Sequence, residues 1–228
     1  MKKSITVVIP AAGAGLRLDP ENPKQFLLHR GLKTIEWTLK AFEVISERIV
    51  KIVICLPETH LHKIHLNHSF KHLDLIAGGA SRQESVYLGL KHLNNLQLLN
   101  HHLCLIHDAA RPLLHPDDLQ QLLEKMDQTN EAALLAIQVK DTLKYSKTDN
   151  LVEKTIPRKD LWQAQTPQGG PGELCLKAHQ EAQDKGWIVT DDASILEQAG
   201  TPVHLVPSHN PNFKITQQQD WELFKRLI

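Results

Sequence analysis

Short apolar runs rich in β-branched residues alternate along this chain with longer stretches of helical period, and this alternation limits the possible folds most. Runs that are apolar on both faces are typical of parallel strands covered by helices. The expected strands span residues 5–9, 51–55, 73–76, 103–106, 133–139 and 202–206. The expected helices span residues 34–44, 81–93, 117–126, 172–185, 192–198 and 218–227. The pattern predicts an α/β fold with a Rossmann-like, doubly wound and mostly parallel sheet, which binds ligands beyond the carboxyl ends of its strands.

The alternation breaks at residues 140–160, which are polar and charged. Two short β-like pieces in this segment, 142–145 and 151–156, flank a turn-forming Thr-Asp-Asn sequence. They predict a β-arm that projects from the sheet. Because such an arm buries little surface alone, we expect it to pack on a second copy of the chain in a homodimer. The 228 residues contain no repeat and no low-complexity linker, so a single domain over residues 1–228 is expected.

Charge and hydropathy exclude several kinds of partner. Lys and Arg together number 26, as do Asp and Glu, so the formal net charge is zero. A protein that binds a nucleic-acid backbone usually carries a basic excess, and we therefore expect no nucleic-acid partner. No apolar stretch approaches the roughly 18 residues that a membrane span needs, so no membrane partner is expected. Cys55, Cys104 and Cys175 lie among apolar neighbours and indicate buried free thiols in a cytoplasmic protein.

The first expected strand leads into a loop of small residues, Pro10-Ala11-Ala12-Gly13-Ala14-Gly15, and two cations follow, Arg17 and Lys24. Small residues let backbone N–H groups approach an anion closely. The loop lacks the third glycine of a dinucleotide fingerprint, and no Gly-Lys-Ser/Thr of a P-loop is present. The segment therefore favours a triphosphate site of another design over a dinucleotide-dependent oxidoreductase. A non-catalytic nucleotide-binding regulator would have little use for both cations.

Two further motifs follow the third and fourth expected strands. In the first, we expect Ser81 to cap a helix while Gly79 and Ser85 face a ligand. In the second, Asp108 at a strand's carboxyl end is placed to organise Mg²⁺ or a substrate hydroxyl, the alternative being an Asp108–Arg111 ion pair that shapes the turn.

Hydroxyl groups and cations recur in later loops and element ends, where each alone could serve as a cap or turn. Together they predict a local positive basin for phosphate and polyol oxygens. These residues are Thr142, Arg158, Thr166, Thr190 and Lys214. Five histidines between residues 60 and 72 lack accompanying Cys or Glu in a zinc pattern, and a solvated face is the better interpretation.

Taken in order, the motifs resemble those of the 2-C-methyl-D-erythritol 4-phosphate cytidylyltransferases of the non-mevalonate isoprenoid pathway. The resemblance covers nearly the whole chain. The motifs that carry it are Pro10-Ala-Ala-Gly-x-Gly-x-Arg17, Pro23-Lys24-Gln25, His107-Asp-Ala-Ala-Arg-Pro112, Gln165-Thr-Pro-Gln168, Thr190-Asp-x-Ala-Ser194 and Lys214-Ile-Thr216. Two positions depart from the family's usual pattern: Gly169-Gly170-Pro171 stands where an aromatic is common, and Asp192 where Glu is commoner.

The resemblance implies a fold of the nucleotide-diphospho-sugar transferase type and cytidylyl transfer from CTP to methylerythritol phosphate, with release of pyrophosphate. It makes Arg17 and Lys24 the catalytic cations, and it implies Mg²⁺ held mainly by the CTP phosphates, with Asp108 nearby and no separate metal-ligand set. The implied CTP-binding residues are Pro10, Ala11, Ala12, Gly13, Ala14, Gly15, Gly79, Ser85 and Lys214. The implied acceptor-binding residues are Asp108, Arg111, Thr142, Arg158, Thr166 and Thr190, with Thr142 and Arg158 supplied by the partner's arm. A ribitol-5-phosphate cytidylyltransferase, or another sugar-phosphate nucleotidyltransferase, remains the alternative.

Overall fold

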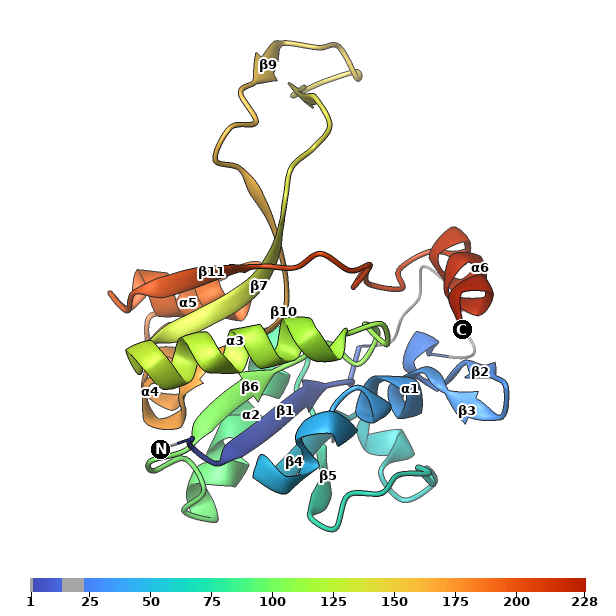
Figure 1. The fold of residues 1–228 in the computed structure, drawn as a ribbon, viewed down its shortest axis with the longest axis vertical. Coiled ribbons are helices and arrows are strands. Elements are labelled where there is room, and N and C mark those ends of the chain that lie inside the picture. The colour runs from blue at the N-terminus through green and yellow to red at the C-terminus, as the bar shows by residue number, and fades with distance from the viewer. Residues whose placement is uncertain (1, 14–22) are drawn as a thin grey trace.

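A seven-stranded sheet in the order β11-β7-β10-β6-β1-β4-β5 runs through the centre of the molecule (Figure 1). The computed structural model describes residues 2–13 and 23–228. The strands are β1 (Ile5–Pro10), β4 (Ile49–Leu56), β5 (Leu73–Ala77), β6 (Leu103–Ile106), β7 (Ala132–Gln138), β10 (Trp162–Pro171) and β11 (Val203–Pro207). All neighbours pair in parallel except β10, which is antiparallel to both β6 and β7. The prediction of a mostly parallel α/β sheet is confirmed.

Helices cover both faces of the sheet because its central strands are apolar on both sides. In β1, Ile5, Val7 and Ile9 face one core cluster while Val8 faces the other. The first cluster is covered by α1 (Thr34–Lys40), the 3₁₀ segment η2 (Glu43–Arg48) and α3 (Pro116–Thr129). The second is covered by α2 (Arg82–Asn95), α4 (Gly172–Asp184) and α5 (Asp192–Gln198). The result is a three-layer arrangement in which alternate residues of one strand enter different cores.

Two elements differ from the sequence-based prediction. The helix expected over residues 34–44 ends at Lys40, and a 3₁₀ segment follows it. The strand β10 was not predicted, and the Gln165-Thr-Pro-Gln168 motif lies within it rather than in a loop. Its register shifts between Ala164 and Gln168, around a cis peptide bond between Thr166 and Pro167. Proline and paired glycines usually interrupt strands, so the local sequence argued against this element.

Gly169 is required in β10 by the close approach of β6. A Cβ atom on Gly169 would lie 1.9 Å from the carbonyl oxygen of Cys104, a backbone atom that cannot rotate away. The glycines at 169 and 170 therefore belong to the packed centre of the sheet, between β6 and β7.

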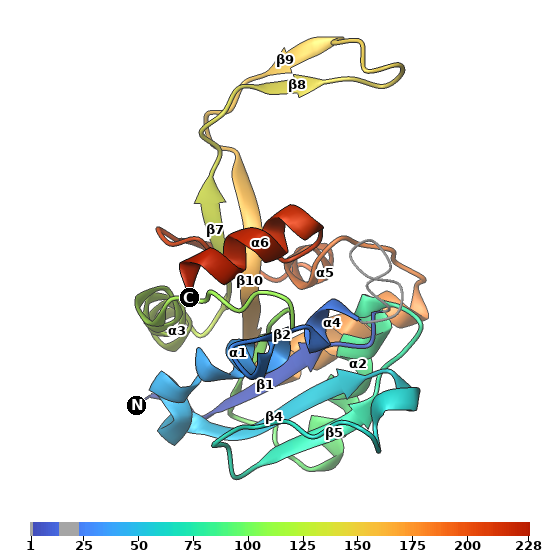
Figure 2. The ribbon, with the colours of Figure 1, turned by 90° about the vertical axis from the view of Figure 1, so that its right-hand side faces the viewer.

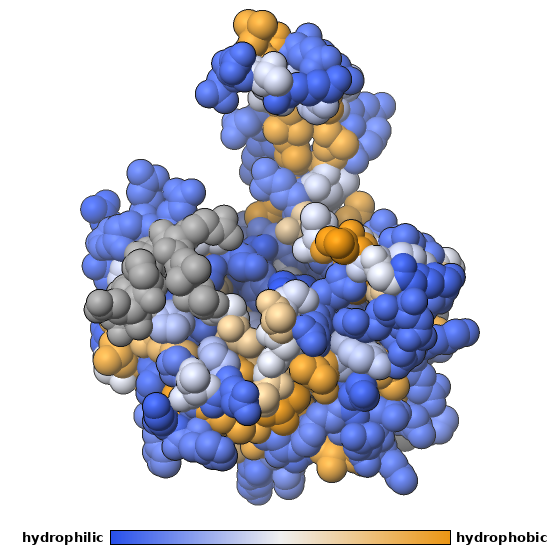
Figure 3. All heavy atoms as spheres, turned by 180° about the vertical axis from the view of Figure 1, so that it is seen from behind, coloured by the Kyte–Doolittle hydropathy of each residue, from blue (hydrophilic) through white to orange (hydrophobic). Residues whose placement is uncertain are grey.

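The predicted arm is present as a hairpin that extends away from the body of the molecule (Figures 1 and 2). Its strands are β8 (Leu143–Tyr145) and β9 (Lys154–Ile156), and Leu143 pairs with Ile156. The second strand is shorter than the expected 151–156. Leu151 is 76% exposed and Val152 is 53% exposed, and apolar atoms are visible on the arm in Figure 3.

The C-terminal segment packs beside the carboxyl ends of the central strands. Helix α6 (Gln218–Leu227) buries Trp221 and Phe224 in a third cluster that includes Ala110 and Ile215. The Ile215 N–H donates to the Ala110 carbonyl at 2.9 Å. These contacts fix the neighbouring Lys214 beside the loop that follows β6. A small hairpin of β2 (Leu28–His29) and β3 (Leu32–Lys33) and the 3₁₀ turns η1 (Lys24–Phe26) and η3 (Glu58–His60) complete the elements.

The three cysteines lie in the interior of the structure. Cys55, Cys104 and Cys175 are buried free thiols, as expected, and burial raises the pKa of Cys55 and of Cys104 to about 12. Within residues 2–13 and 23–228, no helix is long and apolar enough to cross a membrane.

Candidate active site

A cavity of about 650 Å³ opens at the carboxyl ends of the parallel strands. Strands β1 and β6 are neighbours in parallel register, with Val8 opposite Ile106, so the loops that follow them meet there. The described residues that line the cavity come from five segments of the chain. They are Pro10, Ala11, Ala12, Gly13, Lys24, Gln25, Gly79, Ala80, Ser81, Arg82, Ser85, Asp108, Ala109, Ala110, Lys214 and Thr216.

Gln25 holds the small-residue loop in place. Its buried side chain donates through Nε2 to the carbonyl oxygens of Ala11 at 2.7 Å and Gly13 at 3.0 Å. The Ala11 N–H in turn donates to the Cys55 carbonyl at 2.8 Å. The loop is therefore tied to β4 and to η1, which places Lys24 on the same cavity wall. The sequence indicates the motif that contains Gln25, but it does not indicate that this side chain holds the loop.

A second glycine-containing loop closes the opposite wall. A Cβ on Gly78 would lie 2.4 Å from the Ala12 Cβ and 2.9 Å from the Ser85 Oγ, so only glycine lets the two loops meet. Ser81 caps α2, as predicted, by accepting from the Glu84 N–H at 3.0 Å. The Ser85 hydroxyl donates to the Ser81 carbonyl at 2.8 Å and accepts from the Gly79 N–H at 3.1 Å. Ser85 thus lines the cavity while its hydroxyl braces the loop.

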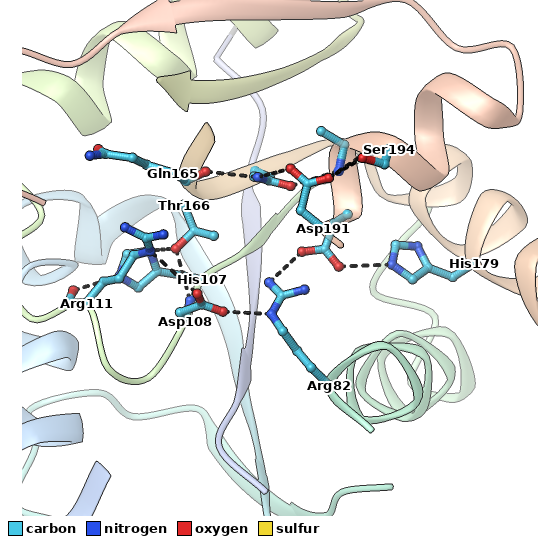
Figure 4. A network of polar contacts seen from close by, with 12 residues as sticks. Arg82, His107, Asp108, Arg111, Gln165, Thr166, His179, Asp191 and Ser194 are labelled. Atoms are coloured by element: carbon cyan, nitrogen blue, oxygen red, sulfur yellow. Dashed lines mark hydrogen bonds and ion pairs between the residues drawn. The ribbon is translucent and has the colours of Figure 1, made fainter. Parts of the chain in front are cut away.

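Asp108 lies among three cationic side chains at the cavity wall, and two of them, Arg82 and Arg111, are drawn beside it in Figure 4. Its carboxylate is 2.7 Å from Arg82 Nε, 2.9 Å from Lys214 Nζ and 3.5 Å from Arg111 Nε. Burial alone would raise the pKa of Asp108, but the charges of Arg82, Lys214 and Arg111 outweigh it and hold that pKa well below its usual range. The Asp108–Arg111 pair is present, yet Arg82 makes the closer contact.

The neutral side chain of His107 supports the loop that carries Asp108. His107 Nε2 faces the Arg111 carbonyl at 3.0 Å, which can only accept, so this nitrogen carries the proton. Its Nδ1 then accepts from the Thr166 hydroxyl at 3.0 Å, and that hydroxyl accepts from the Asp108 N–H at 3.1 Å. Burial lowers the pKa of His107 to about 4. Arg111 completes the group by donating through Nη1 to the Asn212 carbonyl at 2.7 Å.

The predicted site residues fall into four groups. Those on the cavity wall are Pro10, Ala11, Ala12, Gly13, Lys24, Gly79, Ser85, Asp108 and Lys214. Arg111 and Thr166 lie behind the wall and contact Asp108 instead of lining the cavity. Arg17, Ala14 and Gly15 fall outside the described residues.

The remaining three predicted residues lie away from the wall. Thr190 is exposed, directly before α5. Thr142 and Arg158 are exposed at the arm, which points away from the body of its own chain (Figure 2). Arg158 Nη1 donates to the Lys140 carbonyl, which joins the two sides of the base of the arm.

The structure also adds residues that the sequence analysis did not assign to the site. Arg82 lines the cavity and bridges Asp108 and Asp192. Asn212 donates through Nδ2 to the Thr166 carbonyl at 2.6 Å. These contacts join residues 26 to 110 positions apart, so no local pattern in the sequence could have indicated them.

The described residues contain no group of three His, Cys, Asp or Glu side chains able to hold a metal ion. Among these residues, Asp108 is the one carboxylate on the cavity wall, and both of its oxygens already face cations. A magnesium ion at this wall would thus take most of its oxygen ligands from a bound polyphosphate.

The doubly wound sheet, the small-residue loop after β1 and the cation-lined cavity define the chain as an α/β protein of the nucleotidyltransferase type. The family model described as 2-C-methyl-D-erythritol 4-phosphate cytidylyltransferase matches residues 5–227. The chain therefore belongs to this family, and it is an enzyme, a cytidylyltransferase.

Named relatives and solved structures agree with this assignment. The chain is 39% identical to the 2-C-methyl-D-erythritol 4-phosphate cytidylyltransferase of Haemophilus ducreyi, over 98% of this chain and 95% of that protein. It is 36% identical to the enzyme of that name from Bacillus licheniformis, over 94% and 91% of the two chains. The crystal structure of the Francisella tularensis enzyme superposes with a TM-score of 0.84 at 30% identity and covers 99% of this chain and 100% of that one. The resemblance inferred from the motifs is confirmed.

Proposed function

We propose that this chain transfers the cytidylyl group of CTP to the phosphate of 2-C-methyl-D-erythritol 4-phosphate. The products are 4-diphosphocytidyl-2-C-methyl-D-erythritol and pyrophosphate, in isoprenoid precursor biosynthesis. The observation that carries the proposal is the cavity wall, whose described residues include three cations, Lys24, Arg82 and Lys214, and a single carboxylate in a chain of zero net charge. Relatives with the same fold and similar sequence are named for this activity.

The reaction needs charge stabilisation more than proton transfer. The acceptor's phosphate is ionised at neutral pH, so its oxygen attacks the α-phosphorus of CTP directly while pyrophosphate leaves. Asp108 is surrounded by cations and is a poor base, and both ring nitrogens of His107 are engaged within the protein. These features support a mechanism without a general base, in which Lys24 and Arg17 stabilise the charge that develops on the phosphates.

The loops around the cavity suit the two ends of the nucleotide. The backbone of residues 10–15 is assigned to the triphosphate, because small side chains allow close approach of N–H groups. Gly79 and Ser85 are assigned to the nucleoside end, and Lys214 to a phosphate. Mg²⁺ held mainly by the CTP phosphates, with Asp108 nearby, would neutralise phosphate charge.

The acceptor side includes the arm of a second subunit. Thr142 and Arg158 are exposed at the arm and do not line the cavity of their own chain, so we assign them to the acceptor site of the partner in a homodimer. Asp108, Arg111, Thr166 and Thr190 complete the acceptor assignment, Arg111 and Thr166 by supporting Asp108. We further propose a single domain, a cytoplasmic location, and neither a nucleic-acid nor a membrane partner.

Pyrophosphate release in the presence of Mg²⁺ and CTP tests the proposal. Methylerythritol phosphate is compared with ribitol 5-phosphate as acceptor, and we expect rapid release with the former alone. Release with ribitol phosphate alone would preserve the CTP site but contradict the acceptor, and no release with either would contradict cytidylyl transfer to both.

A further inference from the structure

Arg82 connects the cavity to a second carboxylate, that of the buried residue Asp192. The side chain extends from the first turn of α2, and its Nε donates to Asp108 Oδ1 at 2.7 Å. Its Nη2 donates to Asp192 Oδ2, also at 2.7 Å. Two carboxylates held by two different nitrogens of a planar guanidinium fix both its position and its orientation. The Arg82 side chain is 28% exposed and lines the cavity.

His179 contacts Asp192 through the carboxylate oxygen that Arg82 does not contact (Figure 4). This buried side chain on α4 places Nε2 3.2 Å from Asp192 Oδ1 and Nδ1 2.8 Å from the carbonyl oxygen of Cys175. Burial alone would raise the pKa of Asp192, but the Arg82 charge and the His179 contact hold it at about 2. Asp192 is therefore a carboxylate and, like the Cys175 carbonyl, can only accept hydrogen bonds. Because Asp192 can only accept, Nε2 of His179 donates to its Oδ1.

The four side chains form a series of polar contacts, from His179 through Asp192 and Arg82 to Asp108. A buried ion pair is weak evidence for stability, because well-packed apolar residues of similar volume often serve the fold equally well. A series that ends at the cavity wall does have a geometric consequence. If His179 did not hold Asp192, the carboxylate could shift and take Arg82 away from Asp108.

We propose that His179 is a positioning residue for cytidylyl transfer, which donates to Asp192 and thereby holds Arg82 against Asp108 at the cavity wall. This inference rests on the proposed function, but it assigns a role to a residue that touches neither the cavity nor a substrate. The small-residue loop and Lys24 lie on other segments of the wall, so CTP binding is expected to be less affected than the chemical step.

The kinetic test compares His179→Leu and His179→Gln with the unaltered protein. Leucine removes the donor to Asp192, and we expect kcat to fall by roughly 10- to 100-fold, as for a displacement of about 1 Å at an active site, while KM for CTP changes by less than about threefold. Glutamine retains an N–H able to reach Asp192 and should restore much of the lost kcat. The control is Leu122→Ala on α3, a buried position in the other core cluster, which should lower stability but leave the kcat of folded molecules unchanged.

A leucine variant with normal kcat per folded molecule, or equal losses in both variants, would overturn the proposal. A second measurement does not depend on turnover or on the folding of a variant. The ¹⁵N signals of the His179 ring in the unaltered protein, assigned by comparison with His179→Gln, should show a proton on Nε2, the nitrogen that faces Asp192. An unprotonated Nε2 would overturn the inference even if the enzyme is active, and a protonated Nε2 would support it even if the acceptor is a different sugar phosphate.

Discussion

At the scale of single residues, charge is concentrated where the chain as a whole has none. The described cavity wall carries Lys24, Arg82 and Lys214 against one carboxylate, Asp108, although the formal net charge of the protein is zero. The carboxylate keeps Arg82 and Lys214 close together without substrate, since their mutual repulsion is offset by the shared anion. A polyphosphate entering the cavity therefore meets cations that are already in position.

Lys24 offers a direct test of this arrangement. We expect Lys24→Ala to lower kcat by about 10²–10³-fold, the usual effect of removing one group that stabilises transition-state charge, with little change in the melting temperature. The control Lys91→Ala removes a cation from an exposed position of α2 and should leave kcat unchanged. Steady-state pyrophosphate release measures both variants, and near-normal turnover of Lys24→Ala would remove this lysine from the catalytic group.

His107 predicts how stability depends on pH. The pKa of His107 in the folded protein, about 4, lies below the ordinary histidine value of 6.5, so between these values the unfolded chain binds a proton that the native state excludes. Stability is therefore fully present above pH 6.5 and falls as the pH is lowered toward 4. We expect His107→Gln, which can still donate to the Arg111 carbonyl, to reduce this dependence by a few kcal/mol at most. Urea unfolding at several pH values measures it, and parallel curves for the two proteins would contradict the assignment.

At the scale of elements, the apolar runs predicted the parallel part of the sheet because their environment is uniform. Strands such as β1 and β6 are buried on both faces, and their composition shows it. Strand β10 was not predicted because its sequence is determined by contacts with neighbouring strands. The backbone of β6 requires glycine at position 169, and the register of residues 164–168 shifts against β7. The proline and the paired glycines, which normally interrupt a strand, here belong to a strand that packs between β6 and β7.

Gly169→Ala tests whether β10 has this constraint. The added Cβ would meet a backbone oxygen at 1.9 Å, and we expect a loss of unfolding free energy of about 3 kcal/mol or more, at the upper end of overpacking effects. Gln163→Ala, at an exposed position of the same strand, should change stability by about 0.5 kcal/mol or less. Equal stability of the two variants in urea would show that β6 and β10 are not so closely packed.

The same distinction separates the predicted from the unpredicted parts of the site. Loops that follow strands could be located from the sequence, and Lys24, Gly79, Ser85, Asp108 and Lys214 do line one cavity. The contacts of Arg82 with Asp192, and of Asn212 with Thr166, depend on how distant elements pack. A motif identifies what a loop can do, whereas the supporting side chains depend on the completed fold.

At the scale of the whole molecule, the arm stands apart from the rest of its own subunit (Figures 1 and 2). It extends from β7 and β10 away from the body (Figure 1), and it exposes Leu151 and Val152 to solvent. Thr142 and Arg158 are carried with it, away from the wall that holds Lys24. If these residues bind the acceptor, the body that they serve belongs to another subunit.

Mixing two inactive variants distinguishes an arm that acts on its partner from one that acts on its own chain. Lys24→Ala damages the body of a subunit and Arg158→Ala damages its arm. If the arm serves the partner, each mixed dimer contains one site with an intact body and an intact arm. Random exchange makes half of the dimers mixed, with one intact site in two, so pyrophosphate release should recover to roughly a quarter of the normal rate. If the arm serves its own subunit, every site keeps one defect, and a mixture that stays inactive after verified subunit exchange would refute the proposed contribution of Arg158 across the dimer.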